Sequence, residues 1–289
     1  MNESKIPKNT TSPSRQPAEK DGVKLDVMQF PDEMAIFSMP EIPDTDKVRD
    51  LDCGMLALTE LDGVLQRQAK VRDIKPEIVD ITHLDRENRW LVDQVLGEGE
   101  VSMVYLGVDI NARIQESVMA GVWRIRYFNK QDKTTSDMIE VAQVPRLCRR
   151  NVFSSASHRV DTQLKSLPEG VLNAPPLLAE INEKVAEYRP GSESHVINLN
   201  LLPQTEQDLA FLVERLGEGA LTVLSRGYGN CRITSTAVQN VWWVQYFNSQ
   251  DKNILNTLEI GDVPAIAAAA NEDIQESARR LNEIMETYR

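Results

Sequence analysis

Two stretches of the sequence, VWRIRYFNKQDK at 122–133 and VWWVQYFNSQDK at 241–252, are identical at eight of twelve positions. At ordinary residue frequencies, chance would produce about one match or fewer over this length. The similarity continues outward, since the LGEG at 96–99 recurs 120 residues later and the EVAQVP at 140–145 recurs as EIGDVP 119 residues later. Two copies are too few for a solenoid, so the sequence indicates a single module that has been duplicated.

Each copy shows the same order of predicted elements. Apolar residues three or four apart predict an opening helix in both copies, and Pro175 and Pro176 suit the first turn of the second one. A short strand and a short helix follow, with Thr205 as an N-cap and with Gly97 and Gly217 where these short helices end. Three strands and a shorter fourth, which ends at the Val-Pro, predict a largely antiparallel sheet. The short strands, short helices and three following strands are predicted at 78–84, 86–96, 100–106, 112–118 and 122–128, and again at 195–202, 206–216, 220–225, 231–238 and 241–247.

The expected fold class is therefore α+β, with two tandem helix–strand–helix–antiparallel-strand modules at 46–165 and 166–289. Residues 1–24 hold eight Ser, Thr or Pro residues and no aromatic residue, so we expect a disordered N-terminal tail. Residues 25–45 are apolar but interrupted by prolines, which predicts an extended segment laid over the folded body. Residues 265–289 predict a long C-terminal helix with a narrow apolar stripe. We expect this helix to cover its own module, and pairing with a second chain is the alternative.

The composition narrows the class of protein. The 289 residues include 32 basic and 44 acidic side chains, a net charge of −12, which argues against a nucleic-acid partner and suits a basic protein partner. The sequence has no apolar run long enough to span a bilayer and no signal peptide, so we expect no membrane insertion. Three widely spaced cysteines exclude a disulfide framework and are typical of the reducing cytoplasm.

No catalytic or metal-binding motif stands out. The cysteines and histidines show none of the spacings of a zinc site, so we expect no metal, no cofactor and no enzymatic activity. The Gly227-Tyr-Gly229 sequence lies between two predicted strands and is therefore not a dinucleotide-binding loop, which needs a helix after it. The residues considered as metal ligands are Cys53, Cys148, Cys231, His83, His158 and His195.

The two copies provide an internal control, because residues on which they agree serve the shared fold. Where they differ, Cys231 replaces an alanine and Trp243 replaces Arg124, a residue predicted to face solvent. An outward Trp243 would suit a binding hot spot, whereas burial under the C-terminal helix or against the other module is the alternative. Cys231 is interpreted either as an exposed thiol or as an inert core residue. With Arg226 and Tyr228 in the same glycine-bearing loop, these residues form the candidate partner-binding set.

The sequence SRGYGNCRIT at 225–234, together with NVWWVQYFN at 240–248, closely resembles the hydrogenase expression/formation proteins of the HupH/HyaF type. The resemblance covers about 170–289, and the first copy fits the same pattern less closely. It implies an accessory protein of uptake nickel–iron hydrogenase operons that works in the cytoplasm. Such proteins are thought to be chaperones of the hydrogenase small-subunit precursor while its iron–sulfur clusters are acquired under oxygen, before twin-arginine export. They are thought to work beside a thioredoxin-like accessory protein.

Three hypotheses remain open at this point. The first is a chaperone that binds the small-subunit precursor through the second module, with Tyr228, Cys231 and Trp243 at or near the contact. The second is a metal or iron–sulfur carrier that uses Cys231 with ligands from a partner or a second chain. The third is a thiol-dependent enzyme that acts on a nascent cluster.

Overall fold

The repeated strands β4 (Val122–Phe128) and β9 (Val241–Phe247) occupy equivalent places in one antiparallel sheet, which confirms their strand boundaries. The computed structural model describes residues 42–163, 166–227 and 230–288. The tail predicted at 1–24 and most of the segment predicted to be extended lie outside these ranges.

Within the described residues, the two modules repeat the order helix, edge strand, helix and four strands, which confirms the α+β class. The first module follows a short helix, α1 (Thr45–Val48), and consists of α2 (Asp52–Gln68), β1 (Glu77–Asp80), α3 (Arg86–Leu96), β2 (Val101–Leu106), β3 (Asn111–Glu116), β4 and β5 (Thr134–Val141). The second consists of α5 (Ala174–Glu187), β6 (His195–Asn198), the 3₁₀ helix η1 (Leu199–Leu201), α6 (Glu206–Leu216), β7 (Glu218–Ser225), β8 (Asn230–Thr236), β9 and β10 (Asn253–Ile260). The first module is followed by α4 (Arg146–Arg150). The second module is followed by the 3₁₀ helix η2 (Ala265–Ala267) and by α7 (Asn271–Glu286).

Local sequence signals explain several boundaries. Thr205 caps α6 in a reciprocal capping box with Asp208. Gly97 and Gly217 end α3 and α6 with φ values of 56° and 62°, a backbone region that glycine adopts without strain. The fourth strand of each module is eight residues long, so the prediction of a shorter strand was wrong.

Both edge strands are shorter than predicted, for the same physical reason. The Asp80 Oδ1 accepts the N–H of Thr82 at 2.9 Å, and the Asn198 Oδ1 accepts the N–H of Asn200 at 3.0 Å. These turns satisfy the backbone locally and end the strands. In each module the backbone then leaves the sheet, so the predictions that the edge strands continue to 84 and 202 were wrong.

The described strands form one sheet in the order β1-β5-β4-β3-β2-β7-β8-β9-β10-β6. The modules meet where β2 pairs with β7 in antiparallel register. The register pairs include Val101–Ser225, Met103–Val223 and Tyr105–Leu221. Met103 therefore pairs with Val223, its counterpart 120 residues later in the second module. A two-fold rotation about this pair exchanges the flanking pairs Val101–Ser225 and Tyr105–Leu221. This self-complementary arrangement is an internal pseudo-two-fold, the geometry of an isologous dimer within one chain.

One face of the sheet carries the central core, a cluster that draws on both modules. Trp123 and Trp242 are fully buried there, and α4 and the segment around η2 pack against them. The Trp123 indole donates to the Ala142 carbonyl at 2.8 Å, and the Trp242 indole donates to the equivalent Gly261 carbonyl at 3.3 Å. The central core therefore confirms the prediction that the repeated tryptophans point inward.

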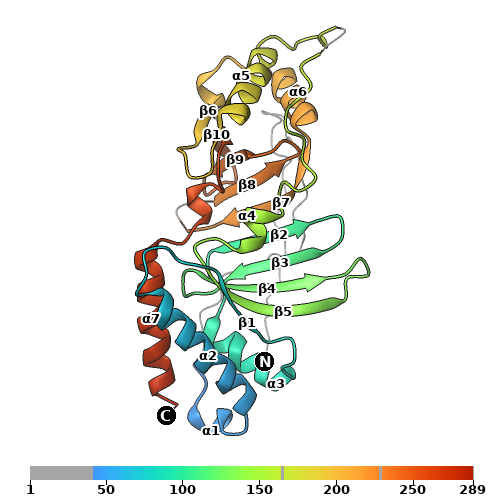
Figure 1. Ribbon diagram of the computed structural model, residues 1–289. Coiled ribbons are helices and arrows are strands. Elements are labelled where there is room, and N and C mark those ends of the chain that lie inside the picture. The colour runs from blue at the N-terminus through green and yellow to red at the C-terminus, as the bar shows by residue number, and fades with distance from the viewer. Residues whose placement is uncertain (1–41, 164–165, 228–229, 289) are drawn as a thin grey trace, which may run out of the picture.

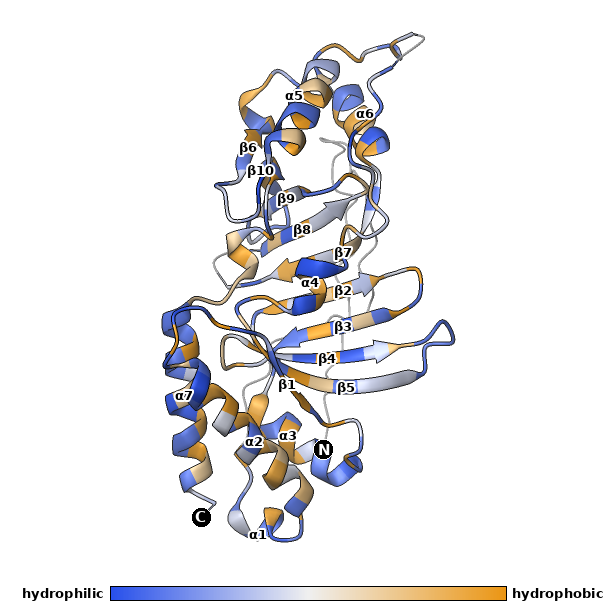
Figure 2. Cartoon of the chain, viewed as in Figure 1, coloured by the Kyte–Doolittle hydropathy of each residue, from blue (hydrophilic) through white to orange (hydrophobic). Residues whose placement is uncertain are grey.

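The opposite face is covered by helices at both ends of the molecule, as Figure 1 shows. The first helical core lies between β1, β5 and helices α2, α3 and α7, and the second lies between β6, β9, β10 and helices α5 and α6. Along the helices of the first module, hydrophobic and hydrophilic positions alternate (Figure 2). This alternation is the pattern of helices that pack on one side and meet solvent on the other.

Helix α7 packs against α2, in the first module, so the prediction that it covers its own module was wrong. Its apolar residues Ile274 and Leu281 are completely buried in the first helical core. The Ser277 hydroxyl donates to the Ala120 carbonyl at 3.0 Å, and the Gln66 amide donates to the Ala278 carbonyl at 2.9 Å. An apolar stripe requires burial but does not select the surface that provides it.

The segment after β5 also crosses, toward the second module. Ser157 forms a parallel bridge with Val238, and the N–H of Val160 donates to the Asn182 amide oxygen at 2.7 Å. The modules therefore exchange the segments that follow their Val-Pro sequences. Among the described residues, no helix has the length and apolar character needed to cross a membrane.

Candidate functional site

Cys231 lies on β8 with its side chain in the central core and only 2% of its surface exposed. Burial raises the pKa of its thiol to about 12, although a hydrogen bond with the Tyr246 hydroxyl acts in the opposite direction. A thiol with such a pKa stays protonated at neutral pH and is a poor nucleophile. The structure therefore contradicts the interpretation of Cys231 as an exposed thiol and supports that of a core residue.

Trp243 lies on the opposite face of the sheet from Cys231, in the second helical core. It is 8% exposed, and its indole N–H donates to the amide oxygen of Asn256 on the neighbouring strand. The prediction of an outward Trp243 was wrong because α5 and α6 cover this face. Trp243 is buried, as in the alternative prediction, but the cover comes from the second module's own helices α5 and α6 and not from the C-terminal helix.

Arg124, the counterpart of Trp243, is also buried, so the prediction that it faces solvent was wrong. Its guanidinium donates to both carboxylate oxygens of Asp137, at 2.5 and 2.7 Å, and to Asp93 on α3. Arg89 adds a further ion pair to Asp137 at 3.4 Å. These contacts form a buried ionic network where the second module has Trp243 and Asn256.

The other residues predicted for partner binding, Arg226 and Tyr228, do not complete a cluster with Cys231 and Trp243. Arg226 is exposed at the end of β7, and its backbone N–H donates to the Glu100 carbonyl at 3.1 Å. Tyr228 lies outside the described residues. Because Cys231 and Trp243 occupy opposite faces of the sheet, the described members of the predicted set do not converge on one surface.

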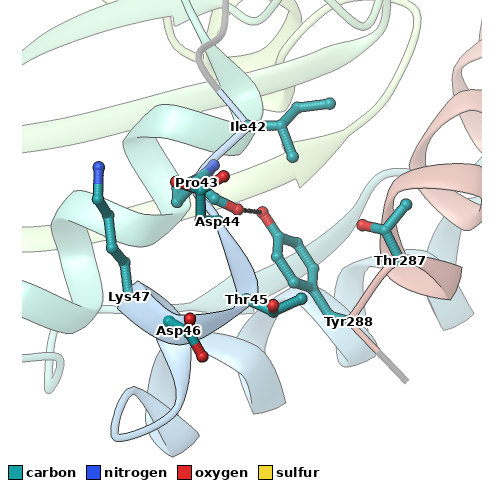
Figure 3. Close-up of a pocket in the computed structure, with 8 residues that line it drawn as sticks. All are labelled: Ile42, Pro43, Asp44, Thr45, Asp46, Lys47, Thr287 and Tyr288. Atoms are coloured by element: carbon teal, nitrogen blue, oxygen red, sulfur yellow. Dashed lines mark hydrogen bonds between the residues drawn. The ribbon is translucent and has the colours of Figure 1, made fainter.

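Over the described parts of the chain, no group of three or more His, Cys, Asp or Glu side chains is arranged to hold a metal ion. An open depression of about 570 Å³ lies between α1 and the end of α7, where the Tyr288 hydroxyl donates to the Pro43 carbonyl at 2.9 Å (Figure 3). The Tyr288 ring packs against the first helical core, so this contact anchors the start of the described chain.

The second module also carries four exposed aliphatic side chains on segments that hydrogen bonds join to one another. We define the apolar platform as Leu172, Leu201, Leu202 and Ile254, which are 68%, 80%, 36% and 57% exposed. These residues come from the loop before α5, from η1 and its C-terminal end, and from the start of β10. The signal in the sequence is the Leu-Asn-Leu-Leu segment at 199–202, which the sequence pattern predicts as the end of a strand.

Hydrogen bonds hold the segments of the apolar platform together. The Asn200 amide oxygen accepts the N–H of Asn256 at 2.7 Å, which joins η1 to β10. The Asn173 amide donates to the Pro203 carbonyl at 2.6 Å, and the Thr205 hydroxyl donates to the Gly170 carbonyl at 2.9 Å. The platform therefore rests on loops with defined geometry, which lowers the entropy cost of binding.

Asp208, the third residue of α6, is the anchor of these loops. One of its carboxylate oxygens accepts the N–H groups of Leu172, Asn173 and Ala174 at 2.8 to 2.9 Å, and the other accepts the N–H of Thr205 at 3.0 Å. Burial of the carboxylate opposes ionisation, but the backbone donors lower the pKa of Asp208 to about 2. The carboxylate is therefore ionised at neutral pH and fixes the start of α5.

Comparisons with known proteins agree with the duplicated architecture. The model of the HupH hydrogenase expression protein, C-terminal conserved region, matches the chain twice, at residues 55–165 and 171–288. The hydrogenase expression/formation protein HoxQ of Cupriavidus necator is 41% identical over 99% of this chain and 98% of its own length. The hydrogenase-1 operon protein HyaF of Escherichia coli is 30% identical over 86% of this chain and 90% of its own length.

A solved structure also matches part of the chain. The hydrogenase expression protein HupH of Thiobacillus denitrificans is 31% identical, with a TM-score of 0.38, over 39% of this chain and 95% of that one. The two matches to the conserved region coincide with the two modules seen in the sheet. This chain therefore belongs to the HupH family of hydrogenase expression/formation proteins.

Proposed function

We propose that this protein is a cytoplasmic accessory factor of nickel–iron hydrogenase maturation. It acts as a chaperone that binds the small-subunit precursor while the precursor acquires its iron–sulfur clusters under oxygen. Support comes from relatives that match 91% or more of this chain and are named hydrogenase expression/formation proteins. A thioredoxin-like accessory protein is the second partner in this proposal.

The observation that carries a binding function is the apolar platform. Two leucines that are 68% and 80% exposed lie on neighbouring loops that are held in place by hydrogen bonds, and exposed apolar side chains grouped in this way support a surface that contacts another molecule. By contrast, the thiol considered for a carrier or an enzyme, Cys231, is buried and has a raised pKa. The geometry therefore favours recognition of a partner over thiol chemistry at Cys231.

The test is a pull-down of the tagged full-length protein from cells that produce the hydrogenase, grown with and without oxygen. Mass spectrometry and iron analysis of the eluate provide the readout. The proposal predicts recovery of the small-subunit precursor, with little iron on the tagged protein itself. Recovery of the tagged protein without any hydrogenase subunit, but with bound iron, would contradict it and favour a carrier.

A further inference from the structure

The two modules carry different residue types at two of the four positions that form the apolar platform. Counted from the turns that end the two edge strands, Leu201 corresponds to His83, and Ile254 corresponds to Thr135, 119 residues earlier. The first module therefore builds the same fold with polar residues at these positions. Aliphatic side chains are not required there by the shared architecture, and in the second module they remain exposed to solvent.

Leu202 shows the same difference in its surroundings. Its counterpart Leu84 is 4% exposed in the first helical core, whereas Leu202 is 36% exposed. The second module has two additional residues between the turn and the following helix, since Asn198 to Thr205 spans seven positions and Asp80 to Asp85 spans five. This longer connection brings Leu201 and Leu202 to the surface.

The segment that carries Leu172, Leu201 and Leu202 is acidic. Residues 166–216, which include its two loops and both helices, contain eight carboxylates and three basic side chains. Glu169 and Glu206 are exposed and adjoin Gly170 and Thr205, which are hydrogen-bonded to each other. An aliphatic surface bordered by carboxylates complements a ligand that presents aliphatic and basic side chains together.

We propose that the apolar platform is the docking site for a segment of a partner protein that presents leucine-like aliphatic side chains together with basic side chains. The inference deepens the proposed function, on which it rests for the identity of that partner. Leu172 and Leu201 supply the apolar contact, and Glu169 and Glu206 attract the basic side chains. Asp208 stays ionised beneath the loops and holds their geometry.

Calorimetry with synthetic peptides tests the chemistry of the platform directly. The probe is a peptide of alternating leucine and lysine, compared with matched peptides that carry glutamate for lysine or serine for leucine. The full-length protein is expected to bind the first peptide best, with an affinity that falls as salt is added. The Leu172→Ser/Leu201→Ser variant is expected to lose ~10-fold or more in affinity.

A matched control is the Leu106→Ser/Val108→Ser variant, which removes two aliphatic side chains of the first module that are 62% and 69% exposed. This control is expected to bind like the unaltered protein, and circular dichroism checks that both variants are folded. Equal binding by both variants, or no preference for the basic peptide, would overturn the proposal. Binding to phosphatidylglycerol vesicles that only the platform variant loses would also overturn it, in favour of a membrane.

A pull-down of the small-subunit precursor separates this inference from the proposed function. If the platform variant recovers the precursor as well as the unaltered protein does, the docking site is wrong and the chaperone function stands. If the peptide results are as expected but the unaltered protein never recovers the precursor, the docking chemistry stands and the proposed partner is wrong.

Discussion

The two modules use different chemistry at the same place under their helices. In the first, Arg124 pairs with Asp137, and in the second, Trp243 bonds to Asn256, which is 119 residues after Asp137. A buried ion pair and a buried aromatic–amide pair therefore fill one position of a shared fold. The comparison teaches that sheet and helix packing tolerate either solution, provided that each buried polar group keeps its partner.

A second difference lies where α7 reaches the first module. Glu116 is 8% exposed, and one of its carboxylate oxygens accepts the N–H of Gly121 at 3.1 Å. Burial raises its pKa to about 7, with smaller contributions from the nearby carboxylates Glu100 and Asp273. The equivalent residue in the second module is Ser235, whose hydroxyl bonds to the backbone of the neighbouring strand.

The largest expected effect comes from removing the second module's aromatic member. Trp243→Ala should destabilise the protein by about 4 kcal/mol, because it leaves a cavity under α5 and α6 and leaves Asn256 without its donor. Denaturant unfolding monitored by circular dichroism measures this loss. A variant with unchanged stability but weakened partner binding would instead restore the hot-spot interpretation of Trp243.

A somewhat smaller effect is expected from the first module's ionic network. Arg124→Met should cost about 3 kcal/mol, since it leaves the buried Asp137 carboxylate with Arg89 as its remaining ion-pair partner. The double variant Arg124→Met/Asp137→Asn should recover more than half of that loss, because it removes the uncompensated charge. Equal destabilisation of the single and double variants in denaturant unfolding would show that packing matters there, not charge.

Glu116 should make stability depend on pH. Its pKa of about 7 lies above that of an unfolded chain, so the folded state binds the extra proton. Its favourable contribution is complete below about pH 4 and is lost as the pH rises toward 7. Glu116→Gln should therefore be more stable than the unaltered protein by about 3 kcal/mol at pH 8 and similar to it near pH 4. The measurement is denaturant unfolding of both proteins at pH 4 and pH 8. The same difference in unfolding free energy between the two proteins at both pH values would contradict this prediction.

The smallest effect is expected at Cys231, where the first module has Ala112. Cys231→Ala should cost about 1 kcal/mol or less in stability, because the shared fold accommodates alanine at this position. Hydrogenase activity in cells that carry this variant should stay at the level of the unaltered protein. A folded variant with abolished maturation would support the thiol models instead.

The repeat made much of the fold predictable. It located the two repeated strands at 122–128 and 241–247 and their inward tryptophans, because alternation and local turn signals are properties of short segments. The candidate site was predicted less well. Alternation leaves Trp243 either outward or buried, because it identifies the two faces of the strand without showing that both faces are covered.

The apolar platform escaped prediction for a related reason. The Leu-Asn-Leu-Leu segment at 199–202 resembles the end of a strand, and the turn at Asn198 takes it out of the sheet. Burial of Leu199 and exposure of Leu201, two residues apart, depend on how the 3₁₀ helix meets β10. A short apolar run does not distinguish these outcomes.

Duplication, the α+β class, the capped helix ends and the apolar stripe of the last helix all follow from the amino-acid sequence, since propensity, capping and periodicity act over a few residues. The pairing of β2 with β7, the crossing of α7 to the first module and the cover over Trp243 follow from tertiary structure. Hydrophobic burial is non-directional, so a pattern states that a surface must be covered. Which surface covers it depends on the packing of the whole chain.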